Sequence, residues 1–396
     1  MKSFKIPRLP LLLKIAIAIV LGIGCSFVFP MGVTRIFVTI NGIFGNFLSF
    51  IIPLIIVALI VPGVADLGKS AGNLLGITAL IAYGSTVFAG FLSYFTCRWT
   101  YPSLLSAGSM DATALQETST QILPYFTIEM PPVMGVMSAL ILAFVLGLGL
   151  AAIQGNTLRN GMCEFRDLTV LVIEKVIIPL LPLYIFGIFL KIGAEGQIAS
   201  VMGTFIKVIV VIFALHILLL LIQFCIAGAV AGKNPIKALM TMLPAYATAL
   251  GTQSSAATIP VTLKQAIKNG VNEDLAGFVI PLCATIHLAG STLKITACAY
   301  AISLINGLPI DISTYGGFIL MLGITMVAAP GVPGGAIMAA LGVLATFLGF
   351  DENTQGLMIA LYIAMDSFGT ACNVTGDGAI ALVVNRINQK RGKRNE

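Results

Sequence analysis

The chain has 396 residues, of which 58% are hydrophobic and only 10% charged, and its net charge is +6. Ordinary soluble domains carry about 25% charged residues, so this composition, with a mean hydropathy of +1.02, excludes a soluble globular protein. The seven cysteines lie mostly inside apolar stretches and show neither a disulfide framework nor metal-ligand spacing. The positive charge gathers at the two ends and therefore indicates membrane topology, not nucleic-acid binding.

Apolar stretches long enough to cross a bilayer, which needs about 20 residues, recur along the whole chain. In chain order they cover residues 10–30, 36–62, 72–96, 132–154, 168–193, 202–231, 276–306, 317–349 and 356–384. No small-residue cleavage site closely follows the first stretch, so we expect it to be retained and not removed as a signal peptide. The pattern predicts an all-α, multi-pass membrane protein, which we expect in the inner (cytoplasmic) membrane.

The basic residues near the ends predict that both termini are cytoplasmic, by the positive-inside rule. The number of complete crossings is then even. Residues 236–268 are flanked by lysines on both sides, which predicts a re-entrant hairpin entering from the cytoplasm. Residues 317–349 are flanked only by acidic residues, which predicts a second hairpin entering from outside. Eight transmembrane helices plus two opposed re-entrant hairpins satisfy this pattern, with inverted repeats over residues 200–270 and 275–384.

Three polar or glycine-rich interruptions lie inside the apolar stretches near the C-terminus. They are Thr252-Gln253-Ser254-Ser255-Ala256-Ala257, Gly331-Val332-Pro333-Gly334-Gly335 and the segment from Asp366 to Asp377. Broken helices at membrane depth are tolerated only where protein or a cavity surrounds them, because lipid cannot satisfy free backbone groups. Such breaks indicate the binding site of a secondary transporter.

The same segments carry a resemblance to a known family. The chain reads Ser-Ser-Ala-Ala-Thr-Ile-Pro-Val over 254–261, Pro-Leu-Cys-Ala-Thr-Ile over 281–286, Gly-Val-Pro-Gly-Gly over 331–335 and Asn-Val-Thr-Gly-Asp over 373–377. These four motifs, in this order, resemble the dicarboxylate/amino acid:cation symporter (glutamate transporter) family, and are most similar to its serine/threonine branch.

A carboxylate deep in an apolar span is costly and indicates function, and Asp366 is therefore the first candidate site residue. The resemblance implies that it neutralises a substrate ammonium, whereas a structural aspartate paired with a base is the alternative. Thr370 and Asn373 share its helix face and suit the substrate carboxylate or backbone, although polar helix packing would also explain them. The other substrate-binding residues that the resemblance implies are Ser254, Ser255, Ser291, Val332, Pro333 and Gly334.

The resemblance also implies Na⁺ as the coupling ion, with no other cofactor. It assigns one sodium to Asp377 with the carbonyls of Asn373 and Cys283, and a second to backbone around Thr285 and the second hairpin. His287, next to these positions, completes the candidate metal set. A helix-end aspartate reaching a basic residue is the structural alternative for Asp377.

Departures from the family pattern bear on selectivity. Gly369 stands where members with acidic substrates have an arginine, and Gln253 replaces an arginine often seen at the first hairpin. A second substrate carboxylate would then lack a bidentate partner, so these two positions predict a neutral amino acid.

The seventh-span motif departs from the family as well. It reads His-Leu-Ala-Gly-Ser over 287–291, so Ala289 replaces a sodium-binding aspartate and leaves Ser85 and Thr86 without a metal assignment. Lys294 follows in an apolar stretch, where its ammonium is a possible cation surrogate. Snorkelling to an interface is the structural alternative for Lys294, and hydrogen-bonded packing is the alternative for His287.

These observations together predict a symporter that imports small neutral L-amino acids of the serine, threonine or alanine type with Na⁺, by an elevator mechanism. The expected scaffold covers residues 1–70 and 130–200, and the transport unit covers 71–100 and 201–396. The expected partners are the amino acid and membrane lipids, with a homotrimer implied by the resemblance and no nucleic acid.

Two further transport activities remain open. One is a proton-coupled or Na⁺-independent exchanger that uses Lys294 or His287, and the other is a dicarboxylate or acidic amino acid carrier if a base reaches the site. A passive channel would not concentrate its substrate, and a membrane enzyme would need an acid–base or metal constellation that the sequence lacks, so we expect no enzyme activity.

Overall fold

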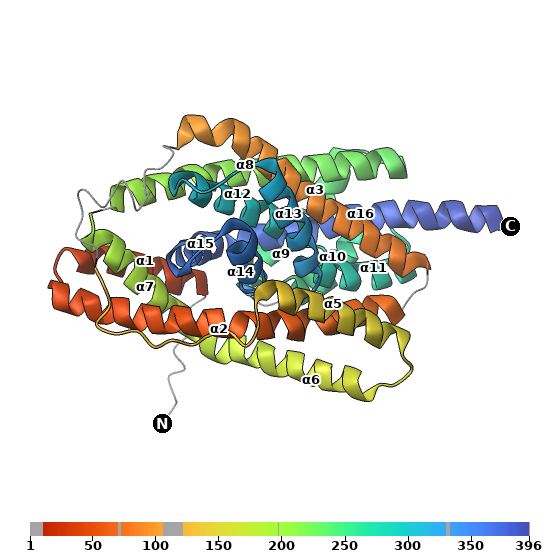
Figure 1. Ribbon diagram of the computed structural model, residues 1–396. Coiled ribbons are helices and arrows are strands. Elements are labelled where there is room, and N and C mark those ends of the chain that lie inside the picture. The colour runs from red at the N-terminus through yellow and green to blue at the C-terminus, as the bar shows by residue number, and fades with distance from the viewer. Residues whose placement is uncertain (1–10, 70–72, 106–121, 197, 330–332, 396) are drawn as a thin grey trace, which may run out of the picture.

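The computed structural model describes residues 11–69, 73–105, 122–196, 198–329 and 333–395, and in these ranges the regular structure is entirely helical (Figure 1). The helices are, in chain order, α1 (Leu11–Ser26), α2 (Met31–Lys69), α3 (Asn73–Leu104), α5 (Val136–Ala152), α6 (Thr157–Val172), the π-helical turn η1 (Ile173–Ile177), α7 (Ile178–Ala194), α8 (Ile198–Ala231), α9 (Pro235–Thr252), α10 (Ser255–Lys268), α11 (Glu273–Ile286), α12 (Ala289–Ile305), α13 (Ile312–Val327), α14 (Gly335–Leu348), α15 (Glu352–Ala364) and α16 (Asp366–Asn395).

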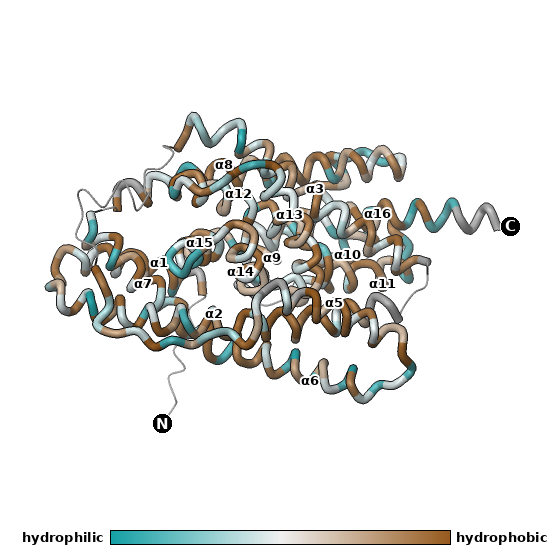
Figure 2. Tube along the Cα trace, in the orientation of Figure 1, coloured by the Kyte–Doolittle hydropathy of each residue, from teal (hydrophilic) through white to brown (hydrophobic). Residues whose placement is uncertain are grey.

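Several of these helices are long and apolar enough to cross a membrane. Within the described ranges there are five such spans, namely Met31–Ala65, Leu74–Leu104, Thr157–Ala194, Val201–Ala231 and Glu273–Ile305, and a sixth if α15 and α16 count as one bent span. Four shorter apolar helices, in α1, α5, α13 and α14, add to them. Figure 2 shows hydrophobic residues along much of α2 and α8, whereas the end of α16 is hydrophilic. The prediction of an all-α, multi-pass membrane protein is confirmed.

The helices pack as two sets. In the first set α2 packs against α5, α6 and α7, and α1 packs against α7. In the second set α16 packs against α8 to α12, while α12 also packs against α3. Figure 1 shows α2 and α6 along one side of the molecule and α8 along the other, with α9, α12 and α14 between them. α14 and α15 contact both sets, because α14 packs against α2, α15 packs against α7, and both also contact α12.

Four breaks lie between consecutive helices from α9 to α16. The first separates α9 from α10 at Gln253 and Ser254, and the second separates α13 from α14 before Gly335. The third lies at His287 and Leu288, between α11 and α12, and the fourth at Met365, where α15 and α16 meet at a bend of 62°. The α9–α10 and α13–α14 pairs pack against themselves, at the two places where the sequence predicts hairpins.

The first and second breaks have local causes. Gln253 ends α9 in the left-handed region with φ 53°, and the Ser254 side chain then caps α10 by accepting a hydrogen bond from the Ala257 N–H. Gly334 precedes α14 with φ 75°, a conformation that glycine adopts without a steric penalty. Val332 lies outside the described residues. A capping serine and a glycine with positive φ thus set where α10 and α14 begin.

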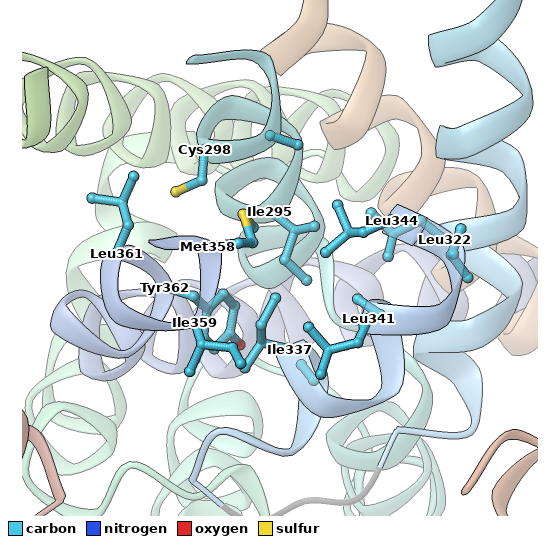
Figure 3. Close-up of a cluster of buried hydrophobic side chains, with 14 of the residues drawn as sticks. Ile295, Cys298, Leu322, Ile337, Leu341, Leu344, Met358, Ile359, Leu361 and Tyr362 are labelled. Atoms are coloured by element: carbon cyan, nitrogen blue, oxygen red, sulfur yellow. The ribbon is translucent and has the colours of Figure 1, made fainter. Parts of the chain in front are cut away.

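The core lies around α12. All seventeen residues of this helix are buried, although it carries a lysine. Figure 3 shows side chains of α12 (Ile295, Cys298), α14 (Leu341, Leu344) and α15 (Met358, Ile359, Tyr362) meeting in one apolar cluster. A lysine on a helix that is covered on every side cannot snorkel to an interface, so the structural alternative for Lys294 is wrong.

Candidate functional site

The helix breaks converge on one small cavity. It measures about 30 Å³ and is lined by Gln253, Ser255, Ala284, Thr285, Leu288, Ser291, Ala329, Ala336, Tyr362, Asp366, Thr370 and Asn373. Residues that are far apart in the chain, between positions 253 and 373, thus line one site. Polar residues predicted from α10, α12 and α16 meet there. Ligand pockets usually measure ~300 Å³ or more, so little free space remains at the site in this structure.

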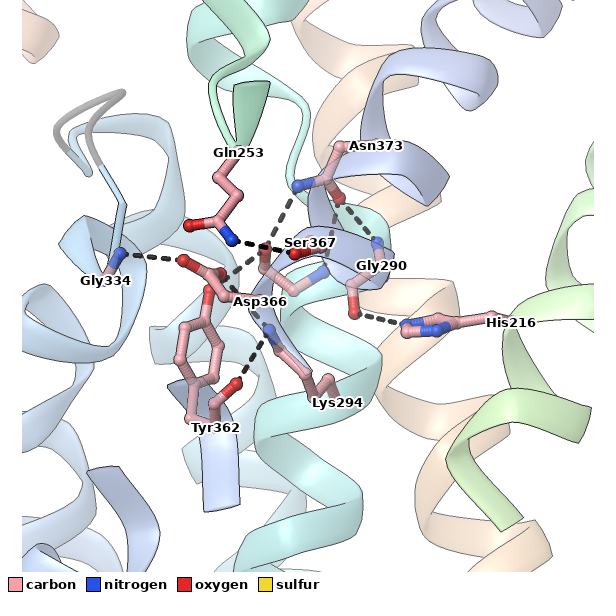
Figure 4. A network of polar contacts seen from close by, with 10 residues as sticks. His216, Gln253, Gly290, Lys294, Gly334, Tyr362, Asp366, Ser367 and Asn373 are labelled. Carbon is pink, nitrogen blue, oxygen red and sulfur yellow. Dashed lines mark hydrogen bonds and ion pairs between the residues drawn. The ribbon is translucent and has the colours of Figure 1, made fainter. Parts of the chain in front are cut away.

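The Asp366 carboxylate is the charged group that faces this cavity, and its side chain is 7% exposed. It begins α16 directly after the bend. One oxygen, Oδ1, lies 3.3 Å from Lys294 Nζ, and the other, Oδ2, accepts a hydrogen bond of 2.8 Å from the Gly334 backbone N–H. Figure 4 shows Asp366 between these two donors. Asp366 therefore ties the start of α14 to a lysine on α12.

Lys294 is fully buried behind Asp366 and does not line the cavity. Its ammonium also donates to the Tyr362 carbonyl at 3.3 Å and lies 3.4 Å from the centroid of the Tyr362 ring, well within cation–π range. A Cβ built at Gly369 would stand 2.9 Å from Lys294 Nζ. The ammonium therefore uses space that any larger residue at position 369 would enter.

Asn373 holds the broken span together. Its Oδ1 accepts hydrogen bonds from the backbone N–H groups of Gly290 at 2.8 Å and Ser291 at 3.2 Å, and its Nδ2 donates to Ser291 Oγ at 3.0 Å. The first N–H groups of a helix have no partner within the helix, so Asn373 caps α12 from a neighbouring helix. Tyr362 completes this group, because its hydroxyl bonds Ser291 Oγ at 3.3 Å.

Gln253 links the first break to α16. Its Nε2 donates to Ser367 Oγ at 2.9 Å (Figure 4), and the residue lines the cavity. Ser254 serves as the cap of α10, while Ser255, the next residue, lines the cavity. Pro333 is half-buried beside Gly334.

A second buried cluster lies where the sequence predicts a sodium site. His287 Nδ1 is 2.8 Å from Asp377 Oδ1, and His287 Nε2 is 3.1 Å from Ser85 Oγ. Gln223 Nε2 donates to the same Ser85 oxygen at 3.0 Å. A Cβ at Gly376 would stand 2.8 Å from both Gln223 Oε1 and His287 Cε1. The imidazole thus occupies the position between Asp377 and Ser85, and Lys294 is not part of this cluster.

The other predicted sodium ligands are engaged with protein groups. The Cys283 carbonyl accepts the His287 backbone N–H at 2.8 Å, and the Thr285 hydroxyl donates to the Leu282 carbonyl at 2.7 Å. Thr285 lines the substrate cavity. The Asn373 side chain caps α12, as described above, whereas the sodium ligand predicted at this residue is its backbone carbonyl.

Sequence reasoning missed three residues that complete these clusters, namely Gln223, Tyr362 and Ser367. Tyr362 lies in an apolar run, and Gln223 is a lone amide on a long apolar helix. A polar residue inside a predicted span is the signal that could have identified Gln223. His216 lies 3.1 Å through Nε2 from the Gly290 carbonyl and supports the start of α12.

Residues 11–387 match the family model described as the sodium:dicarboxylate symporter family. Among curated relatives, the serine/threonine transporter SstT of Acinetobacter baumannii (strain AYE) is 29% identical over 385 residues, which cover 93% of this chain and 95% of that protein. The serine/threonine transporter SstT of Acinetobacter baylyi is 28% identical over 401 residues, which cover 96% and 98% of the two chains. The likeness therefore extends over nearly the whole of each protein.

Proposed function

The chain belongs to the sodium:dicarboxylate symporter family, and we propose that it is a secondary active transporter that imports small neutral L-amino acids together with Na⁺. Serine, threonine and alanine are the proposed substrates. Two relatives of similar length are serine/threonine transporters, and the cavity at the helix breaks is the proposed binding site.

The observation that carries the substrate class is the charge balance of this cavity. Asp366, the charged residue that lines it, is paired with Lys294 at 3.3 Å, and position 369 is a glycine. The fixed charges of this pair sum to zero. A zwitterionic amino acid also has no net charge, so its binding leaves no uncompensated charge in the membrane interior, where such a charge is costly.

The roles proposed for the side chains follow from their positions. Asp366 has two lone-pair directions at each oxygen, and the Gly334 N–H and Lys294 use only one direction each. A substrate ammonium would take a free one. The hydroxyl groups of Ser255 and Thr370, which also line the cavity, would face the substrate carboxylate or side chain.

The proposed gate is the α13–α14 pair. Its second helix, α14, begins at the site, where the N–H of the preceding residue, Gly334, is bonded to Asp366. Opening the pair breaks this hydrogen bond and frees a carboxylate oxygen for the substrate. Glycine at this turn permits the backbone change that opening requires.

The proposed mechanism is of the elevator type, with eight spans, two opposed hairpins and both termini in the cytoplasm. Residues 1–70 and 130–200 form the proposed scaffold, residues 71–100 and 201–396 form the proposed transport unit, and a homotrimer in the inner membrane is the proposed assembly. The two packing sets described above support this division.

Two specific observations favour second candidates. Lys294 Nζ lies 2.9 Å from where a Cβ at position 369 would stand, and this cation behind Asp366 favours a dicarboxylate or acidic amino acid carrier. His287 lies against Asp377 at 2.8 Å, which favours a proton-coupled or Na⁺-independent exchanger.

Uptake into proteoliposomes separates these functions. Labelled serine, alanine, threonine, aspartate and succinate are tested under an inward Na⁺ gradient, an H⁺ gradient or neither. We expect Na⁺-driven accumulation of the neutral amino acids, its loss in Asp366→Ala, and normal activity in the control Asp274→Asn, an exposed residue in the first turn of α11. Preferred uptake of aspartate or succinate would refute the substrate class, and uptake driven by H⁺ alone would refute Na⁺ coupling.

A further inference from the structure

The break between α15 and α16 places two negatively polarised oxygen groups at one point in the core. Tyr362 lies in the last turn of α15, where carbonyl groups lose their helical partners and the helix dipole is negative. Its carbonyl accepts only one backbone hydrogen bond, a short-range one of 3.1 Å from the Met365 N–H. The Asp366 carboxylate follows at once as the first residue of α16. A carbonyl and a carboxylate therefore face the same buried point.

These groups are the kind that bind a cation in membrane transporters. Freed carbonyls at the C-terminal ends of half-helices coordinate Na⁺ in broken-helix transporters, and hard cations prefer carboxylate and carbonyl oxygens. Here both oxygens lie 3.3 Å from the same nitrogen, Lys294 Nζ, and the face of the Tyr362 ring covers it at 3.4 Å. Figure 4 shows the ammonium enclosed by these groups.

Lys294 reaches this point from a different helix. It projects from the fully buried α12, and the absence of a side chain at Gly369 gives it room, since a Cβ there would stand 2.9 Å from Nζ and 3.2 Å from Cε. The lysine, the glycine and the helix break therefore form one arrangement, contributed by α12, α15 and α16.

We infer that the α15–α16 break is a cation site whose cation is the tethered Lys294 ammonium, so that Asp366 is neutralised without an external ion at this point. This inference deepens the proposed function, on which its consequence for transport rests. Symport of a zwitterion would then need one cation fewer than in a protein whose aspartate is unpaired. Removing the lysine leaves the two oxygens in place and makes an external alkali cation necessary.

The first test needs no substrate. The thermal stability of the purified protein is measured at pH 8 against NaCl, KCl and LiCl, with choline chloride keeping the ionic strength constant. The variants are Lys294→Met and Lys294→Ala, the paired neutralisation Lys294→Met with Asp366→Asn, and the matched control Lys207→Met, whose lysine is exposed and bonds the Leu104 carbonyl.

We expect each single Lys294 variant to gain a stabilisation that rises with the logarithm of the alkali cation concentration, beyond that of the wild type, as binding to the native state requires. The paired variant and the Lys207 control should respond as the wild type does. Two outcomes would overturn the inference. One is an equal cation response in all five proteins, and the other is the same gain in the paired variant, since the cation could then not be bound by Asp366.

Uptake provides the second readout. In Lys294→Met the number of Na⁺ ions taken up per serine should rise by about one, measured as charge moved per labelled substrate, whereas a merely structural lysine would lower the rate without changing this ratio. An unchanged ratio would contradict the inference. If none of the proteins transports an amino acid, the proposed function fails, while the substrate-free titration still decides the role of Lys294.

Discussion

Replacing Gly369 by arginine should abolish binding of neutral amino acids without creating an acidic-substrate site. The new Cβ would stand 2.9 Å from Lys294 Nζ and 3.2 Å from its Cε, so the lysine must move away from Asp366. The buried site would then hold two cations for one carboxylate. The added cation also repels the substrate ammonium: two unit charges about 4 Å apart repel by about 4 kcal/mol at an effective dielectric constant of 20, which corresponds to roughly a thousandfold loss of affinity.

The double variant Gly369→Arg with Lys294→Ser should reverse this loss and change the preferred substrate. The serine removes both the repulsion and the steric conflict, and the guanidinium group can then bind a second substrate carboxylate in a bidentate manner. Labelled serine and labelled aspartate are bound and taken up in competition, with Lys294→Ser alone as the control. Wild-type serine affinity in Gly369→Arg would refute the placement of Lys294, and exclusion of aspartate by the double variant would refute the assigned role of position 369.

Three further outcomes follow from buried contacts and from one exposed cap. In a double-mutant cycle of Asp366→Asn and Lys294→Met, each single change should lower the free energy of unfolding in mixed micelles by about 3–5 kcal/mol, and the double change should lower it by much less. A coupling energy below about 1 kcal/mol would contradict the ion pair between the two residues. Gly290→Ala should destabilise the protein by about 1–3 kcal/mol, because its Cβ would stand 2.6 Å from the Cβ of a cysteine on α16. Gly277→Ala, whose Cβ would have no atom within 4 Å, should be neutral or stabilise the protein by about 0.5–1 kcal/mol. Similar unfolding midpoints for the two variants would argue against the close packing at Gly290. The pKa of Asp311, the exposed cap of α13, lies below its ordinary value of 3.8 because hydroxyl and backbone N–H groups of the next residues donate to its carboxylate. The stabilisation of α13 by this cap is therefore complete above about pH 4 and declines as the pH falls further. Hydrogen exchange in the first turn of α13 should report the decline, and Asp311→Asn should remove this pH dependence.

The breaks at Gln253 and Gly334 were predictable because their causes are local. The segment from Asp366 to Asp377, which we also expected to be an interruption, is instead a regular part of α16, and the break lies before it at Met365. A run of serines after Gln253 and the glycines around 334 interrupt apolar segments, and caps and positive φ angles depend on the residues at the break itself. Asp366, Thr370 and Asn373 were expected on one face because α16 is a regular helix, and the structure brings all three to one cavity. The membrane class followed from the sum of side-chain hydropathies.

Helical spacing does not extend across a break, and this limited the interpretation of the seventh span. His287 and Lys294 are two turns apart in a continuous helix, but α11 ends at Ile286 and α12 begins at Ala289. The break changes the direction of the chain, so the two side chains point into different clusters. His287 joins Asp377 and Ser85, whereas Lys294 joins Asp366.

Local sequence accounts for the helical membrane fold, for the breaks at Gln253 and Gly334 and for the carboxylates inside the spans, because hydropathy, caps and helical phase are properties of neighbouring residues. The packing of helices that are far apart in the chain decided which base pairs with each carboxylate. Lys294 and Asp366 are 72 residues apart, and His287 and Asp377 are 90 apart, so each pairing depends on how separate helices pack. Since the two acids lie in different clusters, that packing decides which carboxylate faces the substrate cavity.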